Sequence, residues 1–181
     1  MSKLTGVDGR SDKPLSAAQE LLRDSFTRLI EHVDALTDGL TDDTATYQPA
    51  PGANTIAWLI WHSARVQDAQ VCDIAGSEQV WSLDDWVQRF GLDLPRDDTG
   101  YGHDAKDVVK VKASAKLLAG YYHAVHDMTL TFVATVGDAD LERIVDERWN
   151  PPVTASARLV SIVDDCAQHL GQAAYVRGIA P

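Results

Sequence analysis

Apolar residues recur every three or four positions along four long stretches of this chain, a period typical of amphipathic α-helices. The second stretch, which starts at Ile56, is apolar on almost all sides over its first two turns, so this helix is expected in the core. The pattern predicts long helices at roughly residues 15–37, 54–75, 114–136 and 155–178.

Residues typical of helix caps and stops stand at the ends of these stretches. The candidate N-caps are Ser16, Asn54 or Thr55, and Thr154 or Ser156, and the candidate stops are Asp38-Gly39 and Gly137-Asp138. Pro49, Pro51 and Gly52 exclude regular structure over residues 47–53, just before the second long helix. The helix ends are therefore marked by local chemistry as well as by the apolar period.

The segment from Gly76 to Val111 is the least regular part of the chain. Residues 82–90 predict one short helix with Ser82 as its cap, whereas residues 95–103 are polar and loop-like. Such a long connection is typical of a lid or a pocket wall, although a partly mobile crossover is an equal alternative. The predicted fold is all-α, a four-helix bundle with a long crossover that contains a short helix.

The length of 181 residues fits one domain, which we place at residues 15–181. Residues 1–14, with Gly6, Gly9 and Pro14, predict a flexible N-terminal arm. A hydrophobic content of 45% with five Trp indicates a globular protein rather than a disordered chain.

The net charge of −11 and the absence of a Lys or Arg run argue against binding to nucleic acid or to an anionic membrane. No apolar run approaches the roughly 18 residues of a transmembrane helix, and the polar N-terminus is unlike a signal peptide, so we expect a cytoplasmic protein. In that reducing compartment Cys72 and Cys166 are expected to be small buried hydrophobic residues without a disulfide.

Asp165 and His169 stand four residues apart on the last predicted helix, so their side chains share one face. They could hold a divalent ion together, or Asp165 could accept a hydrogen bond from His169 within the bundle. Two ligands are too few for zinc, which requires a third protein group. The spacing alone therefore leaves both interpretations open.

Other histidines offer weaker signals. His62 lies deep in an apolar segment, where a core histidine bonded to a backbone carbonyl is the simpler interpretation. His123 and His126 are three residues apart, but no further ligand is spaced to complete a site with them. His32, between Glu31 and Asp34, is expected at the surface.

Three features resemble the DinB-like (YfiT-like) metal-binding four-helix bundles over nearly the whole chain after the arm. They are the run Pro-Ala-Pro-Gly-Ala-Asn-Thr-Ile-Ala-Trp-Leu-Ile-Trp-His that ends at His62, the Arg65 and Asp68 that follow, and the stretch from Asp165 through His169 to Gly178. The resemblance implies that His62, Asp165 and His169 are the metal ligands. The acidic residue at Asp165 and the approach over residues 145–158 look most like the mycothiol S-transferase branch.

This resemblance implies an enzyme with Zn²⁺, or nickel, manganese or iron on the same ligands. Two imidazoles and a carboxylate leave a fourth position open, where an entering mycothiol thiol would lose its proton and attack an electrophilic small molecule in detoxification. The sequence ends at Pro181 without the further domain of the related isomerase, which favours the transferase. A homodimer is an additional expectation from the family.

Trp58, Arg65 and Gln172 stand within about one turn of the proposed ligands, so they are candidates for the substrate pocket. For each, core packing or a structural hydrogen bond is the competing interpretation. The competing functions are a metal-dependent hydrolase, in which the open position would hold a water of lowered pKa, and a non-catalytic metal-binding or ligand-binding bundle in the stress response.

Overall fold

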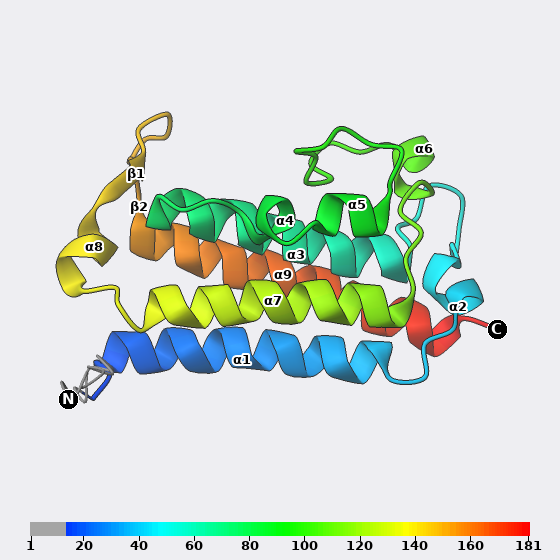
Figure 1. The fold of residues 1–181 in the computed structure, drawn as a ribbon, viewed down its shortest axis with the longest axis horizontal. Helices are drawn as coiled ribbons and strands as arrows, with labels where there is room; N and C mark the ends of the chain where they lie inside the picture. The colour runs from blue at the N-terminus through cyan, green and yellow to red at the C-terminus, as the bar shows by residue number, and fades with distance from the viewer. Residues whose placement is uncertain (1–13) are drawn as a thin grey trace, which may run out of the picture.

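The structure is a computed structural model and describes residues 14–181, so the predicted N-terminal arm lies outside the described residues except for Pro14. Four long helices dominate the molecule (Figure 1). They are α1 (Ala17–Thr37), α3 (Ile56–Ala75), α7 (Ala115–Val133) and α9 (Ala155–Ile179). These bounds agree with the predicted helices to within one turn at every end, and the predicted all-α bundle is confirmed.

Side-chain hydroxyls cap each long helix at its N-terminus. Thr55 rather than Asn54 accepts the Trp58 N–H and caps α3. Thr154 rather than Ser156 caps α9 through the Ala157 N–H. The remaining caps are Ser16 on α1, in a capping box with Gln19, and Ser114 on α7. Each such cap typically contributes about 1 kcal/mol.

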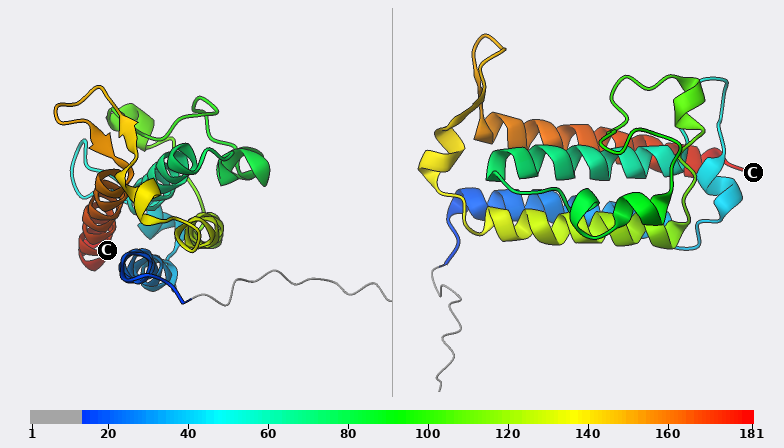
Figure 2. Two further views of the ribbon diagram at one scale, coloured as in Figure 1. Left: turned by 90° about the vertical axis from the view of Figure 1, so that its left-hand side faces the viewer. Right: turned by 45° about the horizontal axis from the view of Figure 1, so that its top comes forward.

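The order of the helices around the bundle explains the long crossover. Helix α3 packs against α7 and α9, and α1 packs against the same two helices, so the consecutive helices α1 and α3 lie diagonally. Figure 1 shows that α3 and α7 run in the same direction, opposite to α1 and α9, and Figure 2 shows the bundle from its end. Because α3 and α7 are parallel neighbours, the chain between them must return along about 30 Å of helix.

The crossover contains three short helices, where the sequence predicted one. They are α4 (Val80–Leu83), α5 (Trp86–Phe90) and α6 (Ala105–Val108). The predicted helix over residues 82–90 is split because Asp85 takes a left-handed conformation, with φ of 57°. The cap predicted at Ser82 is also wrong, since Ser82 lies inside α4.

Four further short elements were not predicted from the sequence. Helices α2 (Asp42–Thr46) and α8 (Asp138–Glu142) lie in the connections before α3 and after α7. Strands β1 (Ile144–Asp146) and β2 (Val153–Thr154) form an antiparallel hairpin that leads into α9. Elements of two to five residues are too short to show a hydrophobic period, so the pattern could not predict them.

One hydrophobic core fills the space between the four helices. It contains fully buried residues from each of them, including Phe26, Trp61, Tyr122 and Ile162. Side chains of the crossover extend this core, because Trp81, Trp86 and Phe90 pack their rings around Tyr121 of α7. The crossover is therefore attached to the bundle by aromatic packing over its first half.

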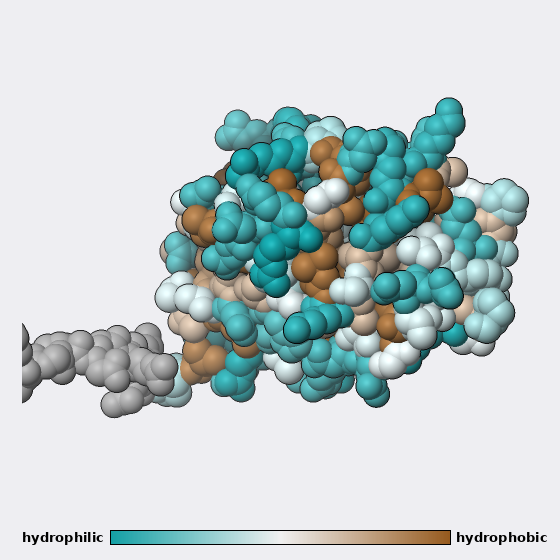
Figure 3. Space-filling view, turned by 45° about the vertical axis from the view of Figure 1, so that its right-hand side comes forward, coloured by the Kyte–Doolittle hydropathy of each residue, from teal (hydrophilic) through white to brown (hydrophobic). Residues whose placement is uncertain are grey.

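The molecular face in Figure 3 is mainly hydrophilic, with hydrophobic side chains exposed in small separate groups. None of the helices in residues 14–181 combines the length and the apolar character that crossing a bilayer requires.

Candidate metal centre

Helix α9 presents Asp165 and His169 on one face, as their spacing predicts. The Nδ1 of His169 donates to the backbone carbonyl of Asp165 over 2.8 Å, and it lies 3.7 Å from the Asp165 carboxylate. Because a carbonyl oxygen only accepts, the ring proton must stand on Nδ1. In the neutral ring, the Nε2 of His169 then has a lone pair for a ligand.

Helix α3 contributes His62, which is 6% exposed within the apolar helix. Its Nδ1 donates to the carbonyl of Thr99 in the crossover. By the same reasoning, Nε2 of His62 keeps its lone pair. Burial lowers the pKa of His62, so the imidazole is neutral near pH 7, the form that binds metal ions.

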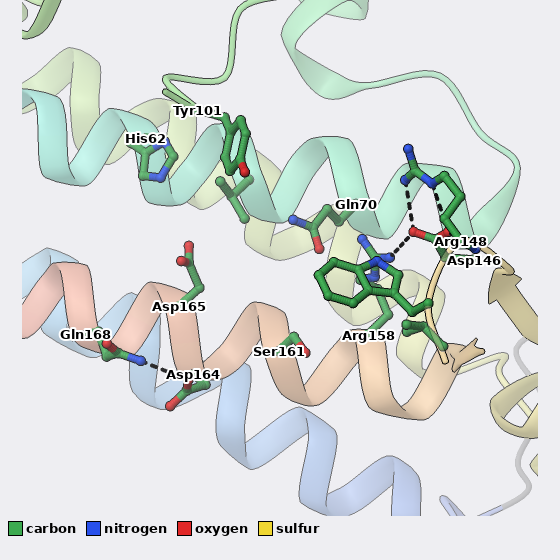
Figure 4. Close-up of a pocket in the computed structure, with 13 residues that line it drawn as sticks. His62, Gln70, Tyr101, Asp146, Arg148, Arg158, Ser161, Asp164, Asp165 and Gln168 are labelled. Carbon is green, nitrogen blue, oxygen red and sulfur yellow. Dashed lines mark hydrogen bonds and ion pairs between the residues drawn. The ribbon is translucent and has the colours of Figure 1, made fainter. Parts of the chain in front are cut away.

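The three predicted ligands converge between α3 and α9. Each offers a ligand atom within 4.8 Å of the other two, and the two imidazole centroids are also 4.8 Å apart. Figure 4 shows His62 and Asp165 facing each other from the two helices. Two atoms bonded to one zinc ion lie at most about 4.2 Å apart, so ion binding requires these side chains to move by ~1 Å.

An unsatisfied oxygen supports the fit of this site to a cation. Oδ2 of Asp165 is shielded from solvent, yet it has no hydrogen-bond partner among residues 14–181. Leaving a buried polar atom without a partner is unfavourable, and a cation would relieve that penalty. Within the described part of the chain, these three residues are also the one group of His, Cys, Asp or Glu close enough to share an ion.

Trp58 lies beside this cluster, as its position one turn before His62 predicts. Its indole stacks on the His62 imidazole with centroids 4.5 Å apart and an interplanar angle of 14°. The indole is also 6.1 Å from the His169 ring, and its Nε1 donates to Nδ1 of His103 over 3.0 Å. Trp58 therefore packs against both histidines of the cluster, while its indole N–H is bonded to His103.

Arg65 lies inside the protein instead of in the cavity. Its side chain is fully buried and pairs with Asp68 over 3.3 Å, which agrees with the structural role given above as the competing interpretation. The same guanidinium donates to the Tyr121 hydroxyl, the Gln79 side chain and the Asp98 carbonyl. Each of its three nitrogens thus has an acceptor within the protein.

Gln172 lies away from the three ligands. It is exposed and lines a separate surface groove of about 390 Å³, together with residues at the start of α3 and near the end of α9. On a helix, Gln172 shares a face with Asp165, but it stands about 4.5 Å beyond His169 along the axis. The structure therefore does not bring Gln172 together with His62.

A cavity of about 1050 Å³ opens beside the cluster. His62, Asp165 and Tyr101 lie at one end of it, while Arg148 and Arg158 lie at the other (Figure 4). Tyr101 of the polar crossover loop borders this cavity and is 92% exposed. The floor between the two ends comes from α3 and α9, with Val66, Gln70 and Ser161.

The polar group at the far end of the cavity was not predicted from the sequence. The carboxylate of Asp146 on β1 accepts hydrogen bonds from Arg148 and from Arg158, which hold the pKa of Asp146 well below its usual range. The only sequence signal was the concentration of charge between Asp146 and Arg158, just before the last helix.

The remaining histidines and cysteines take no part in the cluster. His123 is exposed and contacts Asp34 over 2.7 Å, and His126 is buried separately. Cys72 and Cys166 are buried and unpaired, as predicted. Burial raises the pKa of Cys72 to about 11 and that of Cys166 to about 12, so both stay protonated thiols. Neither has the thiolate character of a nucleophile.

Comparison with known proteins decides the family. A family model described as Mycothiol-S-transferase matches residues 21–180. The chain belongs to the mycothiol-S-transferase family. This membership confirms the resemblance inferred from the runs around His62 and after Asp165.

A solved structure supports the same fold. It is the crystal structure of a conserved protein from Enterococcus faecalis, which is 32% identical to this chain and superimposes with a TM-score of 0.84. The match covers 90% of this chain and 96% of that one. None of the curated proteins matches the chain significantly.

Proposed function

We propose that this protein is a zinc-dependent thiol S-transferase that joins mycothiol to electrophilic small molecules in detoxification. Family membership supports the transfer of a group to or from a thiol. The two unpaired cysteines support the further proposal that the enzyme works in the reducing cytoplasm.

The unsatisfied Oδ2 of Asp165 is the observation that carries the metal-dependent part of the proposal. Around it, His62 and His169 each use Nδ1 for a backbone carbonyl and keep Nε2 free. Two imidazoles and one carboxylate are a ligand set typical of catalytic zinc. Nickel, manganese and iron are accepted by the same donors, so the identity of the metal needs measurement.

A divalent ion on these ligands would supply a Lewis acid that lowers the pKa of a thiol entering the open position. The contribution of the chain is to orient the reactants and to bring them together. The cavity of about 1050 Å³ is at the upper end of small-molecule pockets, which supports room for both a thiol and its partner. Trp58 shields one face of His62, so reactants would approach from the side of Tyr101 and Val66.

The protein's own sulfur atoms are not needed in this scheme. Cys72 and Cys166 are buried with raised pKa values, so the nucleophilic sulfur would come from the small thiol. The electrophile would lose its leaving group, or open its strained ring or double bond, as the new carbon–sulfur bond forms. The thiol proton would pass to solvent through the open side of the cavity.

Metal analysis combined with a thiol-consumption assay tests the proposal. We expect about one zinc ion per chain in the purified protein. His169→Ala should lose the zinc and the conjugation of mycothiol to a dinitrophenyl halide. His123→Ala, which changes an exposed histidine outside the cluster, should retain both. Full activity of the metal-free wild-type protein would refute the mechanism.

Two further assays separate the competing functions. Turnover of amide or ester substrates without thiol consumption would favour the hydrolase. A cobalt-substituted protein whose absorption spectrum does not respond to mycothiol would favour a binding protein without an open coordination position. The S-transferase is expected to show a thiol-dependent change in that spectrum.

A further inference from the structure

A loop of the crossover, residues 98–103, lies directly on the His62 imidazole, and we name it the strap. The Thr99 carbonyl of the strap accepts the hydrogen bond from His62 Nδ1. On one face of the same imidazole the Trp58 indole is stacked. The ring of His62 is thus held at its Nδ1 edge by the strap and on its face by the indole.

Gly100 allows the strap to come this close. A Cβ atom at this position would lie 2.8 Å from His62 Nδ1, 3.0 Å from Trp61 Cζ3 and 3.2 Å from Trp58 Cζ2. These atoms belong to buried rings, so they have little room to move away. Gly100 also has a φ of +88°, which side-chain-bearing residues rarely adopt. Any larger residue would push the strap and the imidazole apart.

Hydrogen bonds within the strap fix its shape. Asp98 accepts from the Gly100 N–H over 2.7 Å and contacts His103 Nε2 over 2.9 Å. His103 Nδ1 accepts the indole N–H of Trp58. Because an indole N–H only donates, His103 Nδ1 carries no proton, and its Nε2–H donates to Asp98. His103 is therefore a neutral bridge between the strap and α3.

Arg65 ties the strap to the interior of the bundle. Its Nε donates to the Asp98 carbonyl over 3.0 Å, one residue before the carbonyl that binds His62. The guanidinium itself is held by Asp68 and by the Tyr121 hydroxyl, both fully buried. The strap is consequently anchored to one of the least mobile parts of the molecule.

We infer that the strap is a positioning device for His62, in which Gly100 and His103 are positioning residues. It sets the tautomer and the direction of the imidazole, so that Nε2 keeps its lone pair toward Asp165 and His169. The inference rests on the proposed metal-dependent function. Loss of groups that orient a metal-binding histidine typically weakens metal affinity 10–100-fold.

Two glycines of the strap provide a matched pair of variants. Gly100→Ala and Gly102→Ala both place a side chain at a positive φ, but a Cβ at Gly102 meets no atom of residues 14–181 within 4 Å. We expect Gly100→Ala to weaken zinc binding at least tenfold in a chelator competition, and Gly102→Ala to change it less than about threefold. Equal affinity in wild type and Gly100→Ala would overturn the inference.

The tautomer of His62 can be measured without metal. In long-range ¹H–¹⁵N spectra of the metal-free protein, wild type and Gly102→Ala should show the Nδ1–H form of His62. Gly100→Ala should lose this signature while far-ultraviolet circular dichroism shows an intact bundle. If wild type binds no zinc, the proposed function fails. The spectra still decide the positioning role, which is refuted if Gly100→Ala keeps the wild-type tautomer.

Two substitutions of His103 form a second pair of variants. This pair tests the inference even if Gly100→Ala does not fold. His103→Gln can accept from Trp58 and donate to Asp98, whereas His103→Leu can do neither. We expect zinc affinity near the wild-type value in His103→Gln and a loss of at least fivefold in His103→Leu. Identical zinc affinity and His62 tautomer in the two variants would remove His103 from the positioning role.

Discussion

Helix α3 contributes to two polar clusters, one around His62 and one around Arg65, which start less than one turn apart. The two clusters differ in how many of their polar atoms have a hydrogen-bond partner. The ion pair of Arg65 and Asp68 is 0% exposed, and the Asp68 carboxylate accepts from two backbone N–H groups and from the Tyr121 hydroxyl. At the neighbouring cluster, Oδ2 of Asp165 lacks a partner within residues 14–181, and two imidazole nitrogens keep their lone pairs.

This difference separates the two clusters, and exposure separates them as well. The side chains of Arg65 and Asp68 are 0% exposed, whereas those of His169 and Asp165 are 18% and 40% exposed. The Arg65 cluster is complete without any ligand and joins α3, α7 and the crossover. In the His62 cluster, Oδ2 of Asp165 has no partner among residues 14–181, and we propose that a cation supplies one. Perturbing each cluster should therefore affect different properties of the protein.

Loss of the structural carboxylate is expected to have the largest effect. Asp68→Ala leaves the buried Arg65 charge without its counter-ion, which should lower the free energy of unfolding by about 3–5 kcal/mol. Chemical denaturation followed by circular dichroism measures this change. Asp73→Ala, an exposed position on the same helix, should stay within about 0.5 kcal/mol of wild type. An Asp68→Ala protein as stable as wild type would contradict the structural role.

Loss of the carboxylate at the proposed metal site should leave the metal-free protein almost unchanged. Asp165→Ala removes an oxygen without a partner, so we expect a change in unfolding free energy within about 1 kcal/mol. Zinc at 100 times its dissociation constant should stabilise wild type by about 2.7 kcal/mol, and this gain should vanish in Asp165→Ala. Asp164→Ala, an exposed neighbour bonded to Gln168, should keep the gain. The same zinc stabilisation in both variants would mean that the ion binds elsewhere.

The smallest effect on stability is expected at Asp146, whose carboxylate accepts hydrogen bonds from Arg148 and Arg158. Its two arginine partners lower its pKa, so it contributes stability above about pH 4, the usual carboxyl value, and this contribution declines as the pH falls toward the folded-state pKa. Arg148 is 86% exposed, and solvent therefore weakens the pair. Denaturation midpoints of wild type and Asp146→Asn should differ near pH 6 and converge between pH 4 and 2. A constant difference over that range would show that charge is not the cause.

The sequence predicted the bundle because its signals are local. Helical period and capping hydroxyls act over a few residues, so Thr55 and Thr154 were each one of two candidate caps before their contacts were known. The closeness of Asp165 and His169 follows from the helix repeat in the same way. His62 joined them only through the family resemblance. The simpler interpretation of His62 was a core histidine bonded to a backbone carbonyl. That interpretation is correct for its Nδ1, which bonds the Thr99 carbonyl.

The strap could not be predicted because its contacts depend on the path of the crossover. Thr99 is 37 positions from His62, and His103 is 45 positions from Trp58. Local sequence shows only that this stretch is polar and rich in glycine. It does not show which of its residues contact α3. The same limit applies to Asp146, whose partner Arg158 belongs to a different element 12 positions away.

The walls and the floor of the large cavity have separate origins. Tyr101 comes from the crossover and Trp149 from the hairpin turn, whereas the side chains of the proposed metal site project from two packed helices. Exchanging or lengthening those connections would change the shape of the cavity, while the two helices keep their packing. If the proposed function holds, changes in surface segments alone could alter which substrates this scaffold accepts.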